Sequence, residues 1–139
     1  MRLEPAECRA RLLAARVSRL ATVSGTGEPH MVPITFALDG DHLYFAVDHK
    51  PKASTDLRRL RNITENPRVS VLVDHYADDW ETLWWARADG LAEIWHDGRS
   101  REDALDLLAA KYPQYAAQRP SGPVVAITLQ QMTGWSYTG

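Results

Sequence analysis

The densest group of charges lies in the segment 49–61, which reads HKPKASTDLRRLR. It holds five basic side chains and one acidic side chain, in a chain whose formal net charge is −2. Lys50 and Lys52 are two residues apart on an extended stretch, so both point to one side. A helix is predicted to begin at Ser54, where its free N–H groups and positive dipole end attract anions. Arg58 and Arg61 share the helical face of Ser54. The segment therefore predicts a phosphate clamp.

A second interpretation of this segment stays open. The basic helix face could instead pair with the acidic segment 74–81, DHYADDWE, which carries four carboxylates. In that case the charges would only stabilise the fold.

The segment GEPHMVPITF contains two prolines, Pro29 and Pro33, in an otherwise strand-like run. Proline cannot donate to a sheet ladder, so backbone groups near Val32 to Thr35 are expected to lack strand partners. A heteroaromatic ring with donors and acceptors on its edge could bind there. The alternative is a kinked edge strand without a ligand.

Five tryptophans are many for 139 residues, and Trp80, Trp84 and Trp85 fall close together. Trp84 and Trp85 are adjacent, so on a strand they face opposite sides of the sheet. One of them could lie in the core while the other contacts a ring ligand or a second subunit. Both could equally belong to a core or a dimer interface.

The elements that must position these residues are predicted from periodicity. Helices are expected from Pro5, over 54–65 and over 100–112, the last with a capping box of Ser100 and Asp103. About six mostly antiparallel strands are expected over 18–24, 29–38, 42–48, 68–76, 84–95 and 124–137, with a bulge at Gly90 and a loop over 114–123. The fold class is thus α+β, mainly β with peripheral helices, in a single domain over 1–139.

Composition narrows the function. A hydrophobic fraction of 45% and a charged fraction of 24% are typical of a globular protein. The near-neutral charge argues against general nucleic-acid binding, and no apolar run could span a membrane, so the expected compartment is the cytoplasm. The five histidines lack zinc-motif spacing, so no metal site is expected, and the single cysteine, Cys8, is expected to be inert.

The order of LATVSGTGEPHMVPITF, LYFAVDHKPK, LRRLRNITENPRVSVLVDHY and the closing strand resembles the pyridoxamine 5′-phosphate oxidase-like split β-barrels. The segment NPRVSVLVDHYADDWETLWWARADG is most similar to the branch that uses the deazaflavin coenzyme F420. The resemblance implies a split β-barrel and a homodimer with two cofactor sites at the subunit interface. It also implies that the ring lies against Pro33, Ile34 and Thr35. The phosphate and acidic tail would meet Lys50, Lys52 and the helix that starts at Ser54, with Arg58 and Arg61 nearby. Trp84 or Trp85 of the partner subunit would complete the pocket.

The function that this resemblance implies is an F420-dependent reductase, which transfers a hydride between the deazaflavin and a small conjugated substrate. The cofactor carries the chemistry, so few catalytic side chains are needed. Tyr76 and His30 are the candidate proton donors, and water is the alternative. Two other functions stay open: an FMN-dependent oxidase or flavin reductase, and a non-catalytic protein that binds the cofactor or a tetrapyrrole.

Overall fold

The computed structural model describes residues 1–47 and 54–139, including all of their side chains except those of 54–57. The helices are α1 (Pro5–Ala14), α2 (Ser54–Glu65), α3 (Arg99–Lys111) and α4 (Pro113–Ala117), with one 3-10 turn, η1 (Trp80–Thr82). The strands are β1 (Ser18–Val23), β2 (Pro29–Ile34), β3 (Ala37–Asp39), β4 (His42–Ala46), β5 (Arg68–His75), β6 (Trp84–Trp95) and β7 (Val124–Ser136). Among the described helices, none is both long and apolar enough to cross a bilayer.

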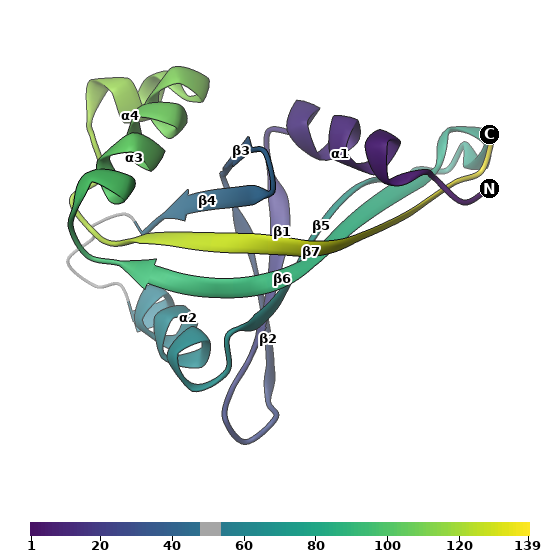
Figure 1. Cartoon of the computed structure of the whole chain (residues 1–139). Coiled ribbons are helices and arrows are strands. Elements are labelled where there is room, and N and C mark those ends of the chain that lie inside the picture. The colour runs from purple at the N-terminus through teal and green to yellow at the C-terminus, as the bar shows by residue number, and fades with distance from the viewer. Residues whose placement is uncertain (48–53) are drawn as a thin grey trace.

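The strands form one antiparallel sheet in the order β2-β1-β5-β6-β7-β4-β3. Its two edge strands, β2 and β3, are consecutive in the chain and are joined only by Thr35 and Phe36. So short a link brings the two edges of the sheet together, and the sheet curls into a barrel that is split between β2 and β3 (Figure 1). The expected α+β class is therefore confirmed. The sheet has seven strands where about six were expected, because the predicted strand 29–38 is two strands that belong to opposite edges.

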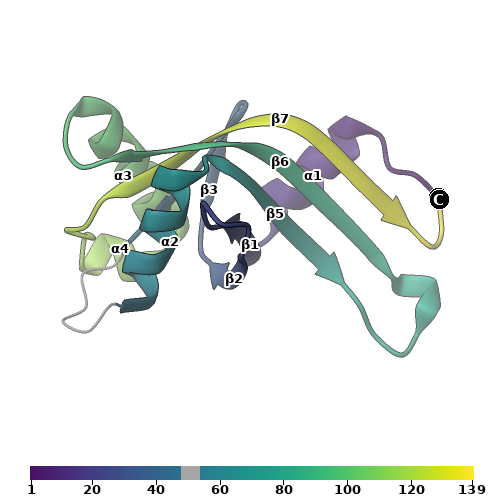
Figure 2. The same ribbon diagram turned by 90° about the horizontal axis from the view of Figure 1, so that it is seen from below.

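The barrel core follows the period-2 alternation of the strands. Leu20, Phe45, Val71, Ala88 and Ile127 point inward and are fully or almost fully buried. A second apolar cluster lies where α3 packs on β3, β4 and β7. The helices α3 and α4 lie together at one end, α1 lies over the other half of the sheet, and α2 lies beside the β1–β2 hairpin (Figures 1 and 2).

Strands β5, β6 and β7 continue past the barrel as a long arm that carries η1 at its tip (Figure 2). Trp84 and Trp85 lie at the start of β6 on this arm, and their register partners on β7 are Ser136 and Trp135. The amino terminus runs along the same arm, because Leu3 N–H donates to the Gly134 carbonyl over 3.0 Å. Both chain ends therefore lie at the tip of the arm.

Strand β6 shifts register against β7 between Asp89 and Gly90. This bulge confirms the position predicted from the glycine. The predicted capping box of α3 is wrong: the helix begins at Arg99, its N-cap is Gly98 at φ 97°, and no side chain caps it. Asp103 instead accepts a hydrogen bond from Arg99 Nε at 3.2 Å, because the helix starts one residue earlier than expected and Ser100 lies inside its first turn.

Candidate functional site

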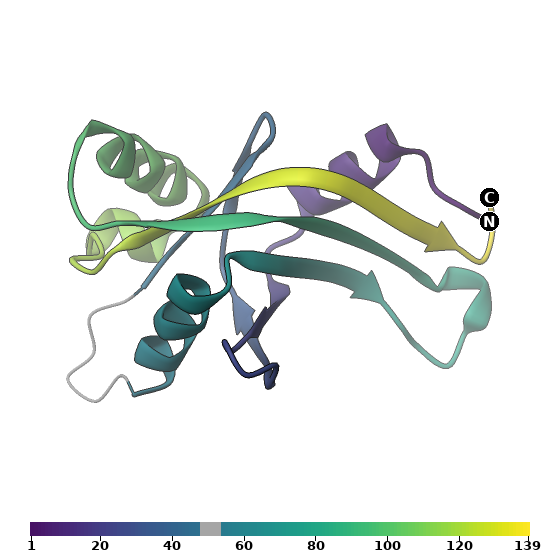
Figure 3. The same ribbon diagram turned by 60° about the horizontal axis from the view of Figure 1, so that its bottom comes forward.

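The β1–β2 hairpin lies beside α2 (Figure 3). His30 on β2, with Arg58 and Arg59 on α2, forms a positively charged corner, which we call the basic corner. His30 is partly buried, and its Nδ1 atom is buried with no hydrogen-bond partner among the residues that the structure describes. Burial lowers the pKa of His30, and the positive charges of Arg58 and Arg59 lower it further. A buried ring nitrogen without a partner beside two guanidinium groups is an environment that an anion would stabilise.

Helix α2 is fixed to the barrel by a buried polar contact. Asn62 Nδ2 donates to Thr22 Oγ1 on β1 over 3.1 Å, and both side chains are almost fully buried. Ile63 packs into the core on the same side of the helix. Arg58 and Arg61 on the same helix are exposed to solvent.

The structure describes only some of the predicted phosphate-binding residues. Ser54 is the first residue of α2, as expected. Lys50 and Lys52 lie outside the described residues, as does the side chain of Ser54. The alternative interpretation, in which this basic face pairs with the segment 74–81, does not hold within one chain, because α2 and the arm that carries the acidic residues lie at opposite ends of the molecule (Figure 1).

The predicted ring-binding segment lies at the far end of β2. Pro33 is exposed on this edge strand, whereas Ile34 is buried in the core. One side of the β2 backbone has no strand partner within residues 1–47 and 54–139. Thr35 follows the strand, and its Oγ1 lies 2.8 Å from the hydroxyl of Tyr115 on α4. His30 and Thr35 are five residues apart, or about 17 Å along an extended strand. The edge of β2 therefore joins the basic corner to the segment predicted to hold a ring.

Trp84 and Trp85 face opposite sides of the sheet, as predicted. Trp84 packs against the core, and the Arg11 guanidinium lies 4.7 Å from its ring centre. Trp85 lines a hollow of about 340 Å³ together with Leu72, Asp74, Tyr76 and Arg87. Both tryptophans are on the arm, so a single chain does not bring them to the basic corner.

The two candidate proton donors are also far apart. His30 lies in the basic corner, whereas Tyr76 lies on the arm and is 62% exposed. A single chain therefore does not combine them in one site.

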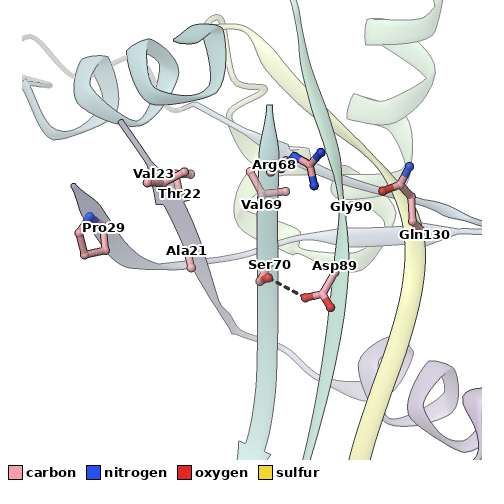
Figure 4. A pocket seen from close by; sticks show the side chains of 10 residues that line it. All are labelled: Ala21, Thr22, Val23, Pro29, Arg68, Val69, Ser70, Asp89, Gly90 and Gln130. Atoms are coloured by element: carbon pink, nitrogen blue, oxygen red, sulfur yellow. Dashed lines mark hydrogen bonds between the residues drawn. The ribbon is translucent and has the colours of Figure 1, made fainter. Parts of the chain in front are cut away.

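A further hollow, of about 360 Å³, crosses the open face of the sheet at the Gly90 bulge (Figure 4). On its floor Ser70 Oγ donates to Asp89 Oδ1 over 2.6 Å, and Arg87 Nε contacts the same carboxylate at 3.1 Å. The Asp89 charge is thus compensated within the chain. The hollow reaches Pro29 on β2, and none of the predicted cofactor contacts whose side chains are described lines it.

The part of the chain that the structure describes has no group of three or more His, Cys, Asp or Glu side chains that could hold a metal ion. Cys8 is buried, and burial raises the pKa of its thiol, so the thiolate is disfavoured.

Comparisons with known proteins agree with this fold. The family described as pyridoxamine 5′-phosphate oxidase matches residues 5–137, and the chain belongs to that family. A 5a,11a-dehydrotetracycline/5a,11a-dehydrooxytetracycline reductase from Streptomyces rimosus is 36% identical over 63 residues, which are 45% of this chain and 43% of the reductase. The match thus spans less than half of that relative.

Solved structures show the same architecture over almost the whole chain. A FAD-binding protein from Mesorhizobium loti is 26% identical, with a TM-score of 0.74 over 96% of this chain and 95% of that one. A heme storage protein from Vibrio cholerae is 19% identical, with a TM-score of 0.72 over 95% and 94% of the two chains, and shares the fold. Family and fold together place the chain among proteins with the oxidoreductase-like fold of pyridoxamine 5′-phosphate oxidase.

Proposed function

We propose that this protein is an F420-dependent reductase, which transfers a hydride between the deazaflavin cofactor and a small conjugated organic substrate. The observation that carries the proposal is the basic corner beside the open edge of β2. His30 Nδ1 is buried there next to Arg58 and Arg59, with no hydrogen-bond partner in the described part of the chain, and these groups fit the anionic end of a phosphorylated cofactor. The deazaflavin tail carries extra carboxylates, which favours it over FMN.

The chain's own residues have binding and orienting roles in this proposal. The cofactor supplies the hydride chemistry when bound. Arg58 and Arg61, with Lys50, Lys52 and Ser54, hold its phosphate and acidic tail. The backbone of Pro33 to Thr35 holds the edge of the ring. Because His30 lies in the basic corner, we assign it to anion binding, and solvent supplies the proton.

The active unit in this proposal is a homodimer with a cofactor site at each side of the interface. The described part of the sheet has an open face that carries exposed apolar side chains, including Met31 at 66% exposure on β2. On the arm, Trp85 and Tyr76 line the hollow of about 340 Å³. In a dimer, Trp84 or Trp85 of the partner subunit would cover the ring and exclude water from it.

A spectroscopic titration of the purified protein against F420, FMN and hemin tests the function. We expect saturable binding of F420 that is tighter than binding of FMN, and oxidation of reduced F420 by a panel of conjugated acceptors. The FAD-binding and heme-storage relatives favour the two alternatives. Binding of FMN alone would establish the flavin enzyme instead, and ligand binding without hydride turnover would establish a binding protein.

The first prediction concerns Arg58. Because its guanidinium is exposed and partly screened, Arg58→Ala is expected to weaken F420 binding by about 1–2 kcal/mol, or roughly 5- to 30-fold in Kd. Arg99→Ala is the matched control, since Arg99 is an exposed arginine at the start of α3, with 90% side-chain exposure. Equal Kd values for the two variants would exclude Arg58 from the site.

The second prediction concerns pH. The pKa of His30 lies below its ordinary value because of burial and of Arg58 and Arg59. A bound anion would favour the imidazolium and raise this pKa, so binding takes up a proton. We expect F420 affinity to be highest where free His30 is protonated, to fall as pH rises from the lowered pKa of free His30 to the higher pKa of the complex, and to stay level above the latter. In His30→Asn this dependence should disappear, and an unchanged pH profile would show that His30 does not face the anion.

A further inference from the structure

The seam of the split barrel is held by the end of α3. The Tyr112 hydroxyl accepts a hydrogen bond from Phe36 N–H at 3.1 Å, and the carbonyls of Phe36 and Arg16 lie 3.0 and 2.8 Å from it. Tyr112 is only 6% exposed. One buried phenol therefore ties the link between β2 and β3 to the segment that enters β1.

A second phenol contacts the residue before Phe36. The Tyr115 hydroxyl lies 2.8 Å from Thr35 Oγ1, and the rings of Tyr112 and Tyr115 meet edge to face at 5.7 Å. Helix α4 has five residues and no buried residue of its own, so it is held through Tyr115, which packs partly buried on the second apolar cluster. The structure thus places a hydroxyl pair at the end of the predicted ring-binding segment.

The direction of this hydrogen bond follows from acidity. The 2.8 Å contact allows either hydroxyl to donate, and the greater acidity of a phenol favours Tyr115 O–H as the donor and Thr35 Oγ1 as the acceptor. The Thr35 hydroxyl then keeps its own hydrogen, and its torsion is fixed by the bond that it accepts. Without Tyr115, this hydrogen could rotate freely or be donated to nearby carbonyls.

We propose that Tyr115 is a positioning residue of the cofactor site: its hydroxyl orients the Thr35 hydroxyl so that Thr35 donates a hydrogen bond to an acceptor on the edge of the bound ring. This inference rests on the proposed function, because it takes the ring to lie against Pro33 to Thr35. Reduction places more negative charge on the ring acceptors, so the bond from Thr35 strengthens in the reduced state. Tyr115 therefore favours the reduced cofactor.

The test is a double-mutant cycle with Tyr115→Phe and Thr35→Val, read by the Kd values of oxidised and reduced cofactor and by the absorption maximum of the bound oxidised form. We expect Tyr115→Phe to raise the Kd of the reduced cofactor roughly 3- to 10-fold, with a smaller change for the oxidised form and a shifted absorption maximum. In the Thr35→Val background, Tyr115→Phe should change nothing further.

Thermal unfolding of each variant shows whether the fold is intact. Thr35→Ser keeps the hydroxyl, so the ratio of the Kd for oxidised cofactor to the Kd for reduced cofactor should return to the parent value. Tyr137→Phe, an exposed tyrosine on the arm, is the control for loss of a phenol hydroxyl. The inference would be overturned if the effects of Tyr115→Phe and Thr35→Val on Kd were additive, or if Tyr115→Phe raised the Kd of the oxidised and reduced cofactor equally. Either result would leave the proposed function intact. If the parent protein binds neither F420 nor FMN, both proposals fall.

Discussion

Gly90→Ala is expected to destabilise the protein by more than about 3 kcal/mol, because the added methyl group would overlap the backbone of the neighbouring strand. A Cβ atom at this position would lie 2.3 Å from the Thr128 carbonyl oxygen and 2.9 Å from Ile127 Cγ2. Strands β6 and β7 would have to separate at the bulge, in the longest pairing of the sheet. The free energy of unfolding in urea measures the loss.

Gly25→Ala is the matched control for this substitution. Its Cβ would meet only the side chain of Glu65, with Oε1 at 3.1 Å, and that flexible side chain can move. We expect a change below about 1 kcal/mol at this position. Comparable unfolding free energies for the two variants would mean that the bulge can relax, and that close strand approach does not require glycine at position 90.

The second large effect is expected for Phe36→Ala, which should cost about 3–5 kcal/mol of stability. Phe36 is fully buried at the seam, and the Lys111 ammonium group lies 4.0 Å above its ring. Phe36→Leu keeps most of the volume and should cost less than about 1.5 kcal/mol. Urea unfolding of both variants separates loss of packing from loss of the ring. Equal costs would show that the cation–π contact, and not the cavity, dominates.

Phe36→Ala should also change how the stability of the protein depends on pH. Burial first, and then the charge of Arg16, lower the pKa of Lys111 to about 8. Lys111 therefore binds a proton in the unfolded chain but not in the folded chain between pH 8 and about 10.5, so this residue's contribution to stability should rise with pH across that window. Opening the site by Phe36→Ala admits water, raises the pKa of Lys111 and should flatten this rise. An unchanged slope would show that Lys111 is not desolvated by Phe36.

Sequence reasoning succeeded where a residue's own chemistry decides its surroundings. Pro33 cannot donate to a ladder and lies on an edge strand, and Gly90 marks the bulge because no larger residue fits there. The start of α2 at Ser54 was also predictable, since helix onset depends on local residues. The same applies to the opposite orientations of Trp84 and Trp85, which follow from strand geometry alone.

The residues that sequence reasoning missed act through distant contacts. Tyr115 was assigned to a loop, yet it lies in a short helix and contacts Thr35, 80 residues earlier. No local pattern reports such a pairing; the only signal was a proline at position 113, a residue type favoured at the first turn of a helix. Likewise, the sequence offers His30 only as a candidate proton donor, and its place beside Arg58 and Arg59 follows from the fold. The local chemistry of the site was therefore predictable, and its assembly was not.

Both ends of the polypeptide lie at the tip of the arm, on the side of the molecule away from α2 (Figure 1). A label, a surface tether or a fused domain joined at either end would therefore project away from the basic corner. Immobilised protein should keep that corner open to small molecules, whereas a bulky fusion would crowd the tryptophan-bearing arm. If pairing of two copies depends on that arm, the size of the attached group becomes a practical control over self-association.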